Sequence, residues 1–362
     1  MSGTVGNNLE RSSGTIGAAG SGITVDSGDP AIDSNPAGGL GTVWSNSTSG
    51  ETYVCTDATA GANVWTNVGD GTGDIEPLPF GGVGGGESYG YSMGGAHPKV
   101  NVIQKYSFTS DGNSTDQSNL TVARNHTNGT QSATYGYCNM GTDPDMDVID
   151  KFQFASGGDS TDVGNSTVAG NYSATMSSSA FGYCSNGNGP HGNVIDKNAF
   201  ASDGNSTDVG DPAVDKDHSA GSSSLTHGYD HGGNDGASSN VILKHSFSAD
   251  GNSSDIANLT VARSTVSGQS SKTHGYCAGG GSSNVIDKYS HSSDADASDV
   301  GNLPTSVGYR AGTSSRTYGY VSGAYPPYNS TQIEKWVFSS DADGTDVGDL
   351  VTGSYAAGGC HV

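Results

Sequence analysis

Polar and apolar positions alternate in short runs along most of this chain, and Gly, Ser or Asp stands at nearly every join between runs. Within residues 264–303, four such runs fall at 264–269, 273–278, 284–291 and 298–303. Alternation with period two over runs of this length is typical of strands, and the three-to-four-residue spacing of amphipathic helices is absent. The pattern therefore predicts units of four short antiparallel strands.

The same pattern recurs six times. Each unit has an aromatic residue or His, a Gly-Tyr pair, a Gly-rich break and a strand containing Ile-x-Lys. The glycine of the pair recurs at spacings of 46, 46, 46, 47 and 44 residues, at Gly90, Gly136, Gly182, Gly228, Gly275 and Gly319. A period in this range indicates a propeller or a solenoid. Four strands per unit favour an all-β fold, a six-bladed β-propeller with four-stranded blades.

The two ends of the repeat region complement each other. The first unit starts near its own second strand at Ser88, and residues 351–362 supply one additional first strand. We expect this C-terminal strand to complete the first blade, which closes the ring and leaves no long unpaired edge.

Two shorter segments precede the repeats, and we divide the chain into residues 1–37, 38–70 and 71–362. Residues 1–37 are rich in Gly, Ser and Asp, which predicts an extended arm that orders only against a partner. Residues 41–68 contain three short strand-like runs, with Trp44 and Trp65 as the expected core of a small β meander.

The formal net charge is −23, and only five of the 37 acidic residues are Glu. Asp favours turns whereas Glu favours helices, so this composition supports a turn-rich β protein. Strong negative charge repels phosphate backbones, which argues against nucleic acid as a partner. The chain has no apolar run near the roughly 18 residues of a membrane-spanning helix, so we expect no membrane insertion.

Every unit carries a lysine followed by an aspartate eleven residues later. We expect the third and fourth strands to fold back and bring the two charges close, either as a buried Lys-Asp pair or with the Asp capping a turn and the Lys extending to it. A ring of lysines that binds an anionic ligand in the channel is the alternative. The pairs are Lys105 and Asp116, Lys151 and Asp162, Lys197 and Asp208, Lys244 and Asp255, Lys288 and Asp299, and Lys335 and Asp346.

A second aspartate lies five residues before the shared one in five units, and Gly157 breaks this set. Its members are Asp111, Asp203, Asp250, Asp294 and Asp341. Segments such as SDGNSTD are similar to calcium-binding loops, but they lack the full set of ligands and the closing Glu. Asx-turns are the favoured interpretation, calcium stays an alternative, and no other cofactor is expected.

Other repeated residues are interpreted as packing residues. The tyrosine of each Gly-Tyr pair is expected to pack between blades with a bonded hydroxyl. His227 and His274 stand where other units have an aromatic ring, and a metal role together with His231 is the alternative. Cys138, Cys184 and Cys277 follow the pair in three different units, which predicts buried free thiols.

The loops between second and third strands vary most and emerge on one face of the ring. If the ring closes as expected, the loop of Tyr325 and Tyr328 adjoins the loop of His97 and Lys99. These four residues form a mixed aromatic and polar patch suited to a sugar, and they are the candidate ligand site. Simple tolerance of sequence variation in loops is the alternative. Motifs of nucleophilic or metal-dependent catalysis are absent, so we expect no enzyme. Glu87 and Glu334 break the repeat and could meet where the first and last blades adjoin.

Two resemblances add to this interpretation. A strand that ends near Gly-Gly (Gly94, Gly232, Gly279), an aromatic strand and the sequence Val-Ala-Arg (Arg124, Arg263) resemble the kelch family, whose fourth-strand Trp is missing here. This implies a kelch-like propeller. The first sixteen residues resemble the N-terminal arms of structural proteins from tailed bacteriophages, particularly marine ones, and residues 41–68 resemble a short module of phage tail-fibre proteins.

The phage resemblance implies a virion structural protein: a fibre, tail appendage or surface decoration located in the virion. Its arm would bind other virion proteins, its propeller would face a host-surface glycan or protein, and further copies of the chain would form a homo-oligomer. One alternative is a secreted or filament-forming surface protein, extracellular or on the cell surface, with a carbohydrate-binding propeller. A polysaccharide-degrading enzyme is the third reading.

Overall fold

The computed structural model describes residues 23–69, 88–96, 98–142, 144–188, 192–328 and 330–362. The chain forms two compact units, residues 1–77 and 78–362, which are described separately below. Within the described residues, no helix has the length and apolar character needed to span a membrane.

The N-terminal unit contains one sheet of four strands, β1 (Thr24–Asp26), β2 (Val43–Asn46), β3 (Thr52–Asp57) and β4 (Val64–Gly69), in that order. Strands β2 to β4 form the expected meander, and the rings of Trp44 and Trp65 meet edge to face at 5.8 Å. The expectation of an extended arm up to residue 37 is wrong at its C-terminal end, because β1 pairs in parallel with β2. Three residues are too short for a sequence pattern, and each pairs with a residue twenty positions further along the chain.

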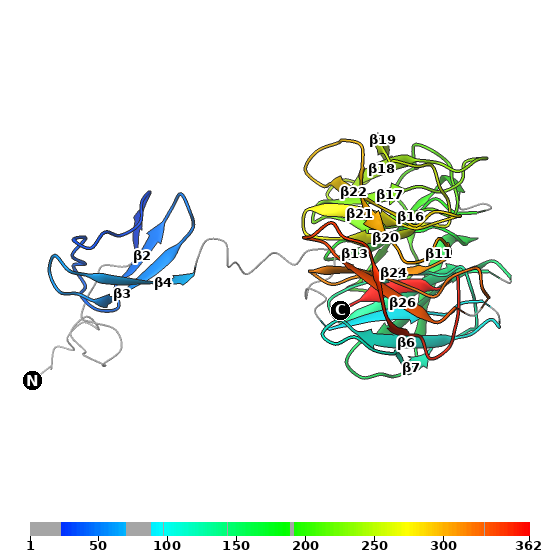
Figure 1. Ribbon diagram of the computed structural model, residues 1–362, viewed down its shortest axis with the longest axis horizontal. Coiled ribbons are helices and arrows are strands. Elements are labelled where there is room, and N and C mark those ends of the chain that lie inside the picture. The colour runs from blue at the N-terminus through cyan, green and yellow to red at the C-terminus, as the bar shows by residue number, and fades with distance from the viewer. Residues whose placement is uncertain (1–22, 70–87, 97, 143, 189–191, 329) are drawn as a thin grey trace, which may run out of the picture. The chain divides into compact units, whose positions relative to one another are not determined.

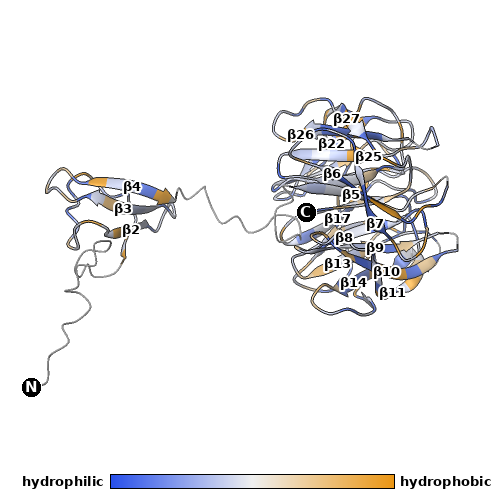
Figure 2. Cartoon of the chain, turned by 90° about the horizontal axis from the view of Figure 1, so that it is seen from below, coloured by the Kyte–Doolittle hydropathy of each residue, from blue (hydrophilic) through white to orange (hydrophobic). Residues whose placement is uncertain are grey.

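The second unit consists of six four-stranded antiparallel sheets (Figure 1). Hydrophobic residues occupy short stretches of these strands, separated by polar ones (Figure 2). From the innermost strand outward, the first sheet is β28 (Gly358–His361), β5 (Tyr89–Met93), β6 (Val102–Ser107) and β7 (Thr115–Asn119); the second is β8 (Asn128–Gln131), β9 (Tyr135–Gly141), β10 (Met146–Gln153) and β11 (Thr161–Gly170); the third is β12 (Ala174–Ser177), β13 (Phe181–Ser185), β14 (Ile195–Ala199) and β15 (Thr207–Asp208).

The remaining three sheets repeat this order. The fourth is β16 (Ala220–Ser223), β17 (His227–His231), β18 (Val241–Ser246) and β19 (Ser254–Asn258); the fifth is β20 (Ser267–Ser270), β21 (His274–Ala278), β22 (Val285–Ser290) and β23 (Ser298–Asn302); the sixth is β24 (Ala311–Ser314), β25 (Tyr318–Ser322), β26 (Gln332–Val337) and β27 (Thr345–Asp349). The four runs that the sequence predicts in residues 264–303 correspond to β20 to β23.

The C-terminal strand closes the ring. Strand β28 pairs in antiparallel fashion with β5, so Cys360 lies opposite Tyr91. The innermost strands β8, β12, β16, β20, β24 and β28 each contact the next, and β28 also contacts β8. The expected closure is therefore confirmed, and the arrangement is consistent with a β-propeller. We call the boundary between two neighbouring sheets a seam.

Aromatic residues pack across every seam. The tyrosine of each Gly-Tyr pair lies against a ring of the next sheet, as in Tyr276 and Phe338 at 4.5 Å, and the expected packing role is confirmed. The preceding glycine makes room for a large third-strand side chain, because a Cβ at Gly319 would lie 2.3 Å from the Trp336 ring. The hydroxyls of Tyr137 and Tyr229 bond backbone oxygens, whereas those of Tyr91, Tyr183 and Tyr320 have no partner within the described residues.

The predicted cysteines and histidines are also packing residues. All five cysteines are buried free thiols. His227 and His274 occupy the place where Tyr89, Tyr135, Phe181 and Tyr318 lie under a lysine ammonium at 3.8 to 4.7 Å. His231 is fully buried and meets the Tyr289 ring at 5.7 Å.

The expected pairing of each lysine with the aspartate eleven residues later is wrong. Lys105 lies opposite Thr115 in the sheet, and Asp116 lies opposite Gln104, so Asp116 points to the other face. Five lysines instead bind the second aspartate of the next sheet across a seam, four of them at 2.7 to 2.8 Å. These pairs are Lys151 with Asp203, Lys197 with Asp250, Lys244 with Asp294, Lys288 with Asp341 and Lys335 with Asp111. None of the six lysines lines the channel.

The Asp-rich turns bind the preceding sheet as well. At all six seams an Asn or Asp of this turn accepts a hydrogen bond from a backbone N–H on the neighbouring fourth-strand segment, as Asp343 does from Asn302 at 2.8 Å. Asp162, Asp208, Asp299 and Asp346, which belong to the shared set, accept from the N–H of the glycine two residues on and so form Asx-turns of their own. The Asx-turns favoured at the second aspartates stay a prediction, and those carboxylates bind lysines instead.

Four buried ion pairs, which sequence reasoning missed, anchor the connections that enter the inner strands. They are Arg124 with Asp150, Lys216 with Asp230, Arg263 with Asp287 and Arg310 with Glu334. Glu334 is fully buried and accepts hydrogen bonds from both terminal guanidinium nitrogens of Arg310. Its interpretation as an acid that breaks the repeat is wrong, because it plays the part of Asp150 and Asp287 in their sheets. Glu87 lies outside the described residues.

Candidate functional site

Six equivalent residues each lie two positions before the first residue of an inner strand, at one mouth of the central channel. All six have left-handed backbones, with φ between 51° and 60°. Non-glycine residues adopt this conformation at a cost, and such residues gather at functional sites. The six are His126, Tyr172, His218, Thr265, Tyr309 and Ala356.

The backbone itself links these positions around the mouth. The N–H of Thr265 donates to the carbonyl of His218 at 2.8 Å, and that of Tyr309 donates to Thr265 at 3.0 Å. Ala356 and His126 continue the chain of bonds at 2.8 and 2.6 Å. Backbone hydrogen bonds thus connect five of the six positions to a neighbour on the next sheet, which fixes the direction of their side chains.

Four of the six positions carry rings, and these converge over the channel. Tyr172 stacks on His218 at 3.6 Å and meets His126 at 4.0 Å. Tyr309 comes from the sixth sheet, yet it lies 5.9 to 6.3 Å from His126, His218 and Tyr172 of the second to fourth sheets. The rings therefore meet across the axis and cover the mouth.

Three further tyrosines extend this layer outward. Tyr309 contacts Tyr325 and Tyr355 at 6.1 and 5.9 Å, and Tyr325 meets Tyr328 at 4.7 Å with their hydroxyls 3.3 Å apart. Tyr328 is 53% exposed, so the layer reaches solvent. We call the seven rings the aromatic cluster: His126, Tyr172, His218, Tyr309, Tyr325, Tyr328 and Tyr355.

The structure brings together half of the residues that the sequence proposed. Tyr325 and Tyr328 both belong to the aromatic cluster, while His97 lies outside the described residues and Lys99 is exposed. Both loops contact the same segment, because the backbone of Ala96 donates to Tyr355 at 3.0 Å and that of Ala324 donates to Ser354 at 3.1 Å. The other five rings were missed, although four of them share one register of the repeat.

Hydrogen bonds link the polar groups of the cluster. The Tyr172 hydroxyl and His126 Nε2 are 2.6 Å apart, and Asp217 Oδ1 lies 2.7 Å from His218 Nδ1. Burial, with a smaller contribution from His218, lowers the pKa of His126 to about 3. Burial raises the pKa of Tyr309, and the hydrogen bond to Tyr328 raises that of Tyr325, so both phenols stay protonated at neutral pH.

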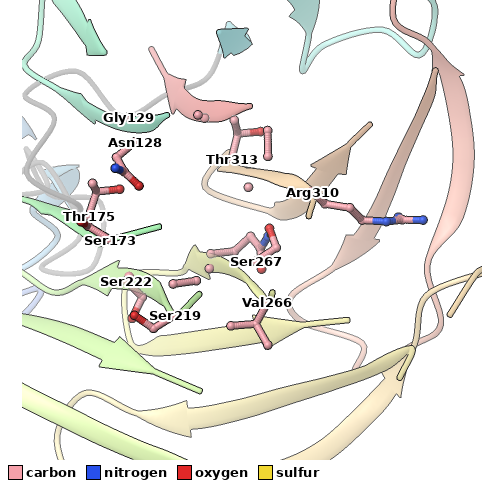
Figure 3. Close-up of a pocket in the computed structure, with 18 of the residues that line it drawn as sticks. Asn128, Gly129, Ser173, Thr175, Ser219, Ser222, Val266, Ser267, Arg310 and Thr313 are labelled. Carbon is pink, nitrogen blue, oxygen red and sulfur yellow. The ribbon is translucent and has the colours of Figure 1, made fainter. Parts of the chain in front are cut away.

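Below the cluster, the inner strands enclose a channel with a volume of about 140 Å³. Figure 3 shows side chains such as Asn128, Ser173, Ser219 and Thr313 around one common space, whereas Arg310 extends away from it. Asn128 Nδ2, the hydroxyls of Ser173 and Ser219, and Gln269 Oε1 are buried and have no hydrogen-bond partner within the described residues. The channel wall thus offers neutral donors and acceptors.

A ring of hydrogen bonds closes the inner strands at their other end. Backbone N–H groups donate to the hydroxyl of the next sheet's serine, and the closing strand uses His361 Nδ1 in place of a hydroxyl. The acceptors are Ser177, Ser223, Ser270, Ser314 and His361. Burial lowers the pKa of His361 to about 4.

The chain enters the ring on the face opposite the aromatic cluster. Strand β5 starts where Tyr89 N–H donates to Val362 at 3.0 Å, at the far end of β28. It ends toward Ala96, which contacts Tyr355. Ser88, where the described part of the ring begins, therefore lies away from the cluster.

The chain matches no protein-family model and no curated protein.

Proposed function

We propose that this chain is a surface-attachment protein that binds a neutral saccharide at the aromatic cluster. The observation that carries the proposal is the convergence of seven rings over one mouth of the ring of sheets, with exposed Tyr328 at its rim. Tyrosine rings present flat apolar faces that suit the C–H faces of a sugar, and their hydroxyls and the neighbouring imidazoles supply hydrogen bonds.

The position of the cluster supports an attachment role. The chain enters on the opposite face, so a ring held by its N-terminal segment can leave the cluster open to an outside surface. The channel is too small for an oligosaccharide, because an engineered apolar cavity of about 150 Å³ holds only a benzene molecule. We therefore place the sugar on the outer surface of the cluster.

The wider proposal is a kelch-like six-bladed propeller that belongs to the virion of a tailed phage. Six closed sheets and the resemblance to kelch repeats support the fold, and the resemblances of residues 1–16 and 41–68 support the virion. In this setting the protein is a fibre, tail appendage or surface decoration. It contacts other virion proteins through its N-terminal segment and acts as a homo-oligomer.

Two alternatives place the same ring of sheets in another setting or give it another activity. A secreted or filament-forming surface protein would bind its sugar at the same cluster, so only its location distinguishes it. The polysaccharide-degrading enzyme would need Glu87 and Glu334 as its two acids. Glu334 is buried against Arg310 and cannot reach a substrate.

Two experiments test the proposal. The full chain, applied to a panel of bacterial and algal surface glycans, is expected to bind neutral sugars with dissociation constants between about 1 μM and 1 mM. Labelled antibodies against the ring of sheets are expected to mark phage particles in electron micrographs of the natural material that contains the protein. Absence of glycan binding contradicts the binding proposal, and label on free filaments or cell surfaces replaces the virion with the secreted alternative.

A further inference from the structure

The seam between the first and second sheets differs from the other five. In those five, a lysine ammonium binds an aspartate of the next sheet. At this seam the aspartate is replaced by Gly157, and Lys105 has no ion-pair partner within the described residues. At the first seam, a glycine thus stands where the other seams have the aspartate that binds the lysine.

A second departure from the repeat lies at the same place. The residue after the shared aspartate is Val or Ile in five units, Val163, Val209, Ile256, Val300 and Val347, but it is Gln117 in the first. A Cβ at Gly157 would lie 2.5 Å from Gln117 Nε2, so the amide stands beside the place of the missing side chain. By equivalence with the other five lysines, the Lys105 ammonium also points to this position, which then has two donors where the other seams hold a carboxylate.

Lys105 is held in the same way as the paired lysines. Its ammonium lies 3.8 Å from the centroid of the Tyr89 ring, and the corresponding distance for Lys151 over Tyr135 is 4.3 Å. Burial lowers the pKa of Lys105, because the ammonium has lost part of its hydration and no carboxylate compensates for it.

Neighbouring negative charge does not exclude an anion here. Asp159 lies two residues beyond Gly157 and accepts hydrogen bonds from Asn119. The same combination occurs at two occupied seams, where Asp294 binds Lys244 beside Asp296 and Asp341 binds Lys288 beside Asp343. A carboxylate and the second acid therefore coexist in this geometry.

We propose that the first seam is a binding site for the carboxylate of a small organic acid, with Lys105 and Gln117 as its donors. The five occupied seams show the geometry of the bound group. Acetate is the atom-for-atom replacement for the aspartate side chain, and any ligand that presents an unhindered carboxylate uses the same contacts.

The test is a titration of the full chain with sodium acetate at constant ionic strength, followed by NMR of ¹³C-labelled lysine side chains. The Lys105 signal, assigned with Lys105→Arg, is expected to shift with half-saturation on the order of 10–100 mM, as suits one partly exposed ion pair. Glucuronate and N-acetylaspartate amide then distinguish a sugar acid from a peptide-like source, with glucose and N-acetylasparagine amide as neutral controls.

The chain supplies a matched control. Gly157→Asp places its own carboxylate in the site and is expected to reduce the acetate-induced shift of Lys105 by at least about tenfold. The variant is expected to fold, because five sheets carry aspartate at this position and Asp341 does so with φ at 45°, near the 64° of Gly157. Gln117→Val, the residue of the other units, is expected to weaken acetate binding with Lys105 still responding.

Two results overturn the proposal. One is a Lys105 signal that acetate does not move beyond the shift seen with chloride. The other is an equal acetate response in wild type and Gly157→Asp, since a filled site cannot bind a second carboxylate. Neither result bears on saccharide binding at the aromatic cluster, which lies at the other end of the strands.

Discussion

The free energy of unfolding is expected to fall steeply as the pH drops from 6.5 toward 4. Burial lowers the pKa of His245, His291 and His361 to about 4, that of His126 to about 3 and that of His231 well below 6.5. The folded state therefore binds fewer protons than the unfolded state in this window. Stability is fully present above pH 6.5 and is lost as the pH falls, by about 1.4 kcal/mol per pH unit for each buried histidine.

Other units of the repeat provide the variants for this measurement. His291→Phe introduces the residue found at Phe108 and Phe247, and His361→Ser introduces the residue found at Ser177. Urea unfolding at pH 7 and pH 4.5 is expected to show a smaller loss of stability in each variant than in the wild type. A loss as large in the double variant as in the wild type contradicts the assignment to these histidines.

Removal of one buried carboxylate is expected to cost about 3–5 kcal/mol of folding free energy. Asp287 is fully buried, lies 3.1 Å from Arg263 and accepts two hydrogen bonds from Thr260 at 2.6 and 3.1 Å. In Asp287→Leu the Arg263 charge stays buried without its counter-ion. Chemical denaturation measures the loss, and Lys151→Met, which breaks a half-exposed pair, is expected to cost below about 1 kcal/mol.

The fourth sheet shows how the loss can be reversed. There the acid stands on the second strand as Asp230, opposite Leu243 on the third, and its cation is Lys216. In the fifth sheet Cys277 lies opposite Asp287. The triple variant Arg263→Lys, Cys277→Asp, Asp287→Leu recreates the arrangement of the fourth sheet and is expected to regain most of the lost stability. A triple variant no more stable than Asp287→Leu contradicts this account.

Much of the fold could be predicted from the sequence because six units carry the same residue pattern. The units, the closing strand and the stacking of the Gly-Tyr tyrosines follow from a residue pattern that each sheet shares. The partners of the lysines do not, because Lys151 and Asp203 are 52 residues apart and meet only across a seam. The spacing within the hairpin of the third and fourth strands suggested Asp162 as the partner of Lys151. The alternation of side chains along a strand turns Asp162 to the other face of the sheet.

The candidate site was predicted in part for a related reason. Tyr325 and Tyr328 stand out because they interrupt a repeat, whereas His126, Tyr172 and Tyr309 occupy a register that varies in residue type. Their left-handed backbones carry no Gly or Asn signal, and Tyr172 and Tyr309 are 137 residues apart. Only the closed ring brings them together across the axis.

The most direct test of the account is the affinity of the full chain for the saccharide that the glycan panel identifies. The measurement compares the wild type with the double variant Tyr325→Ala, Tyr328→Ala and with Tyr135→Ala, the same substitution on the opposite face. The double variant is expected to bind at least about tenfold more weakly, because each stacked ring contributes of order 1 kcal/mol, while Tyr135→Ala binds like the wild type. Equal affinity of the double variant and the wild type would contradict a binding site at the aromatic cluster.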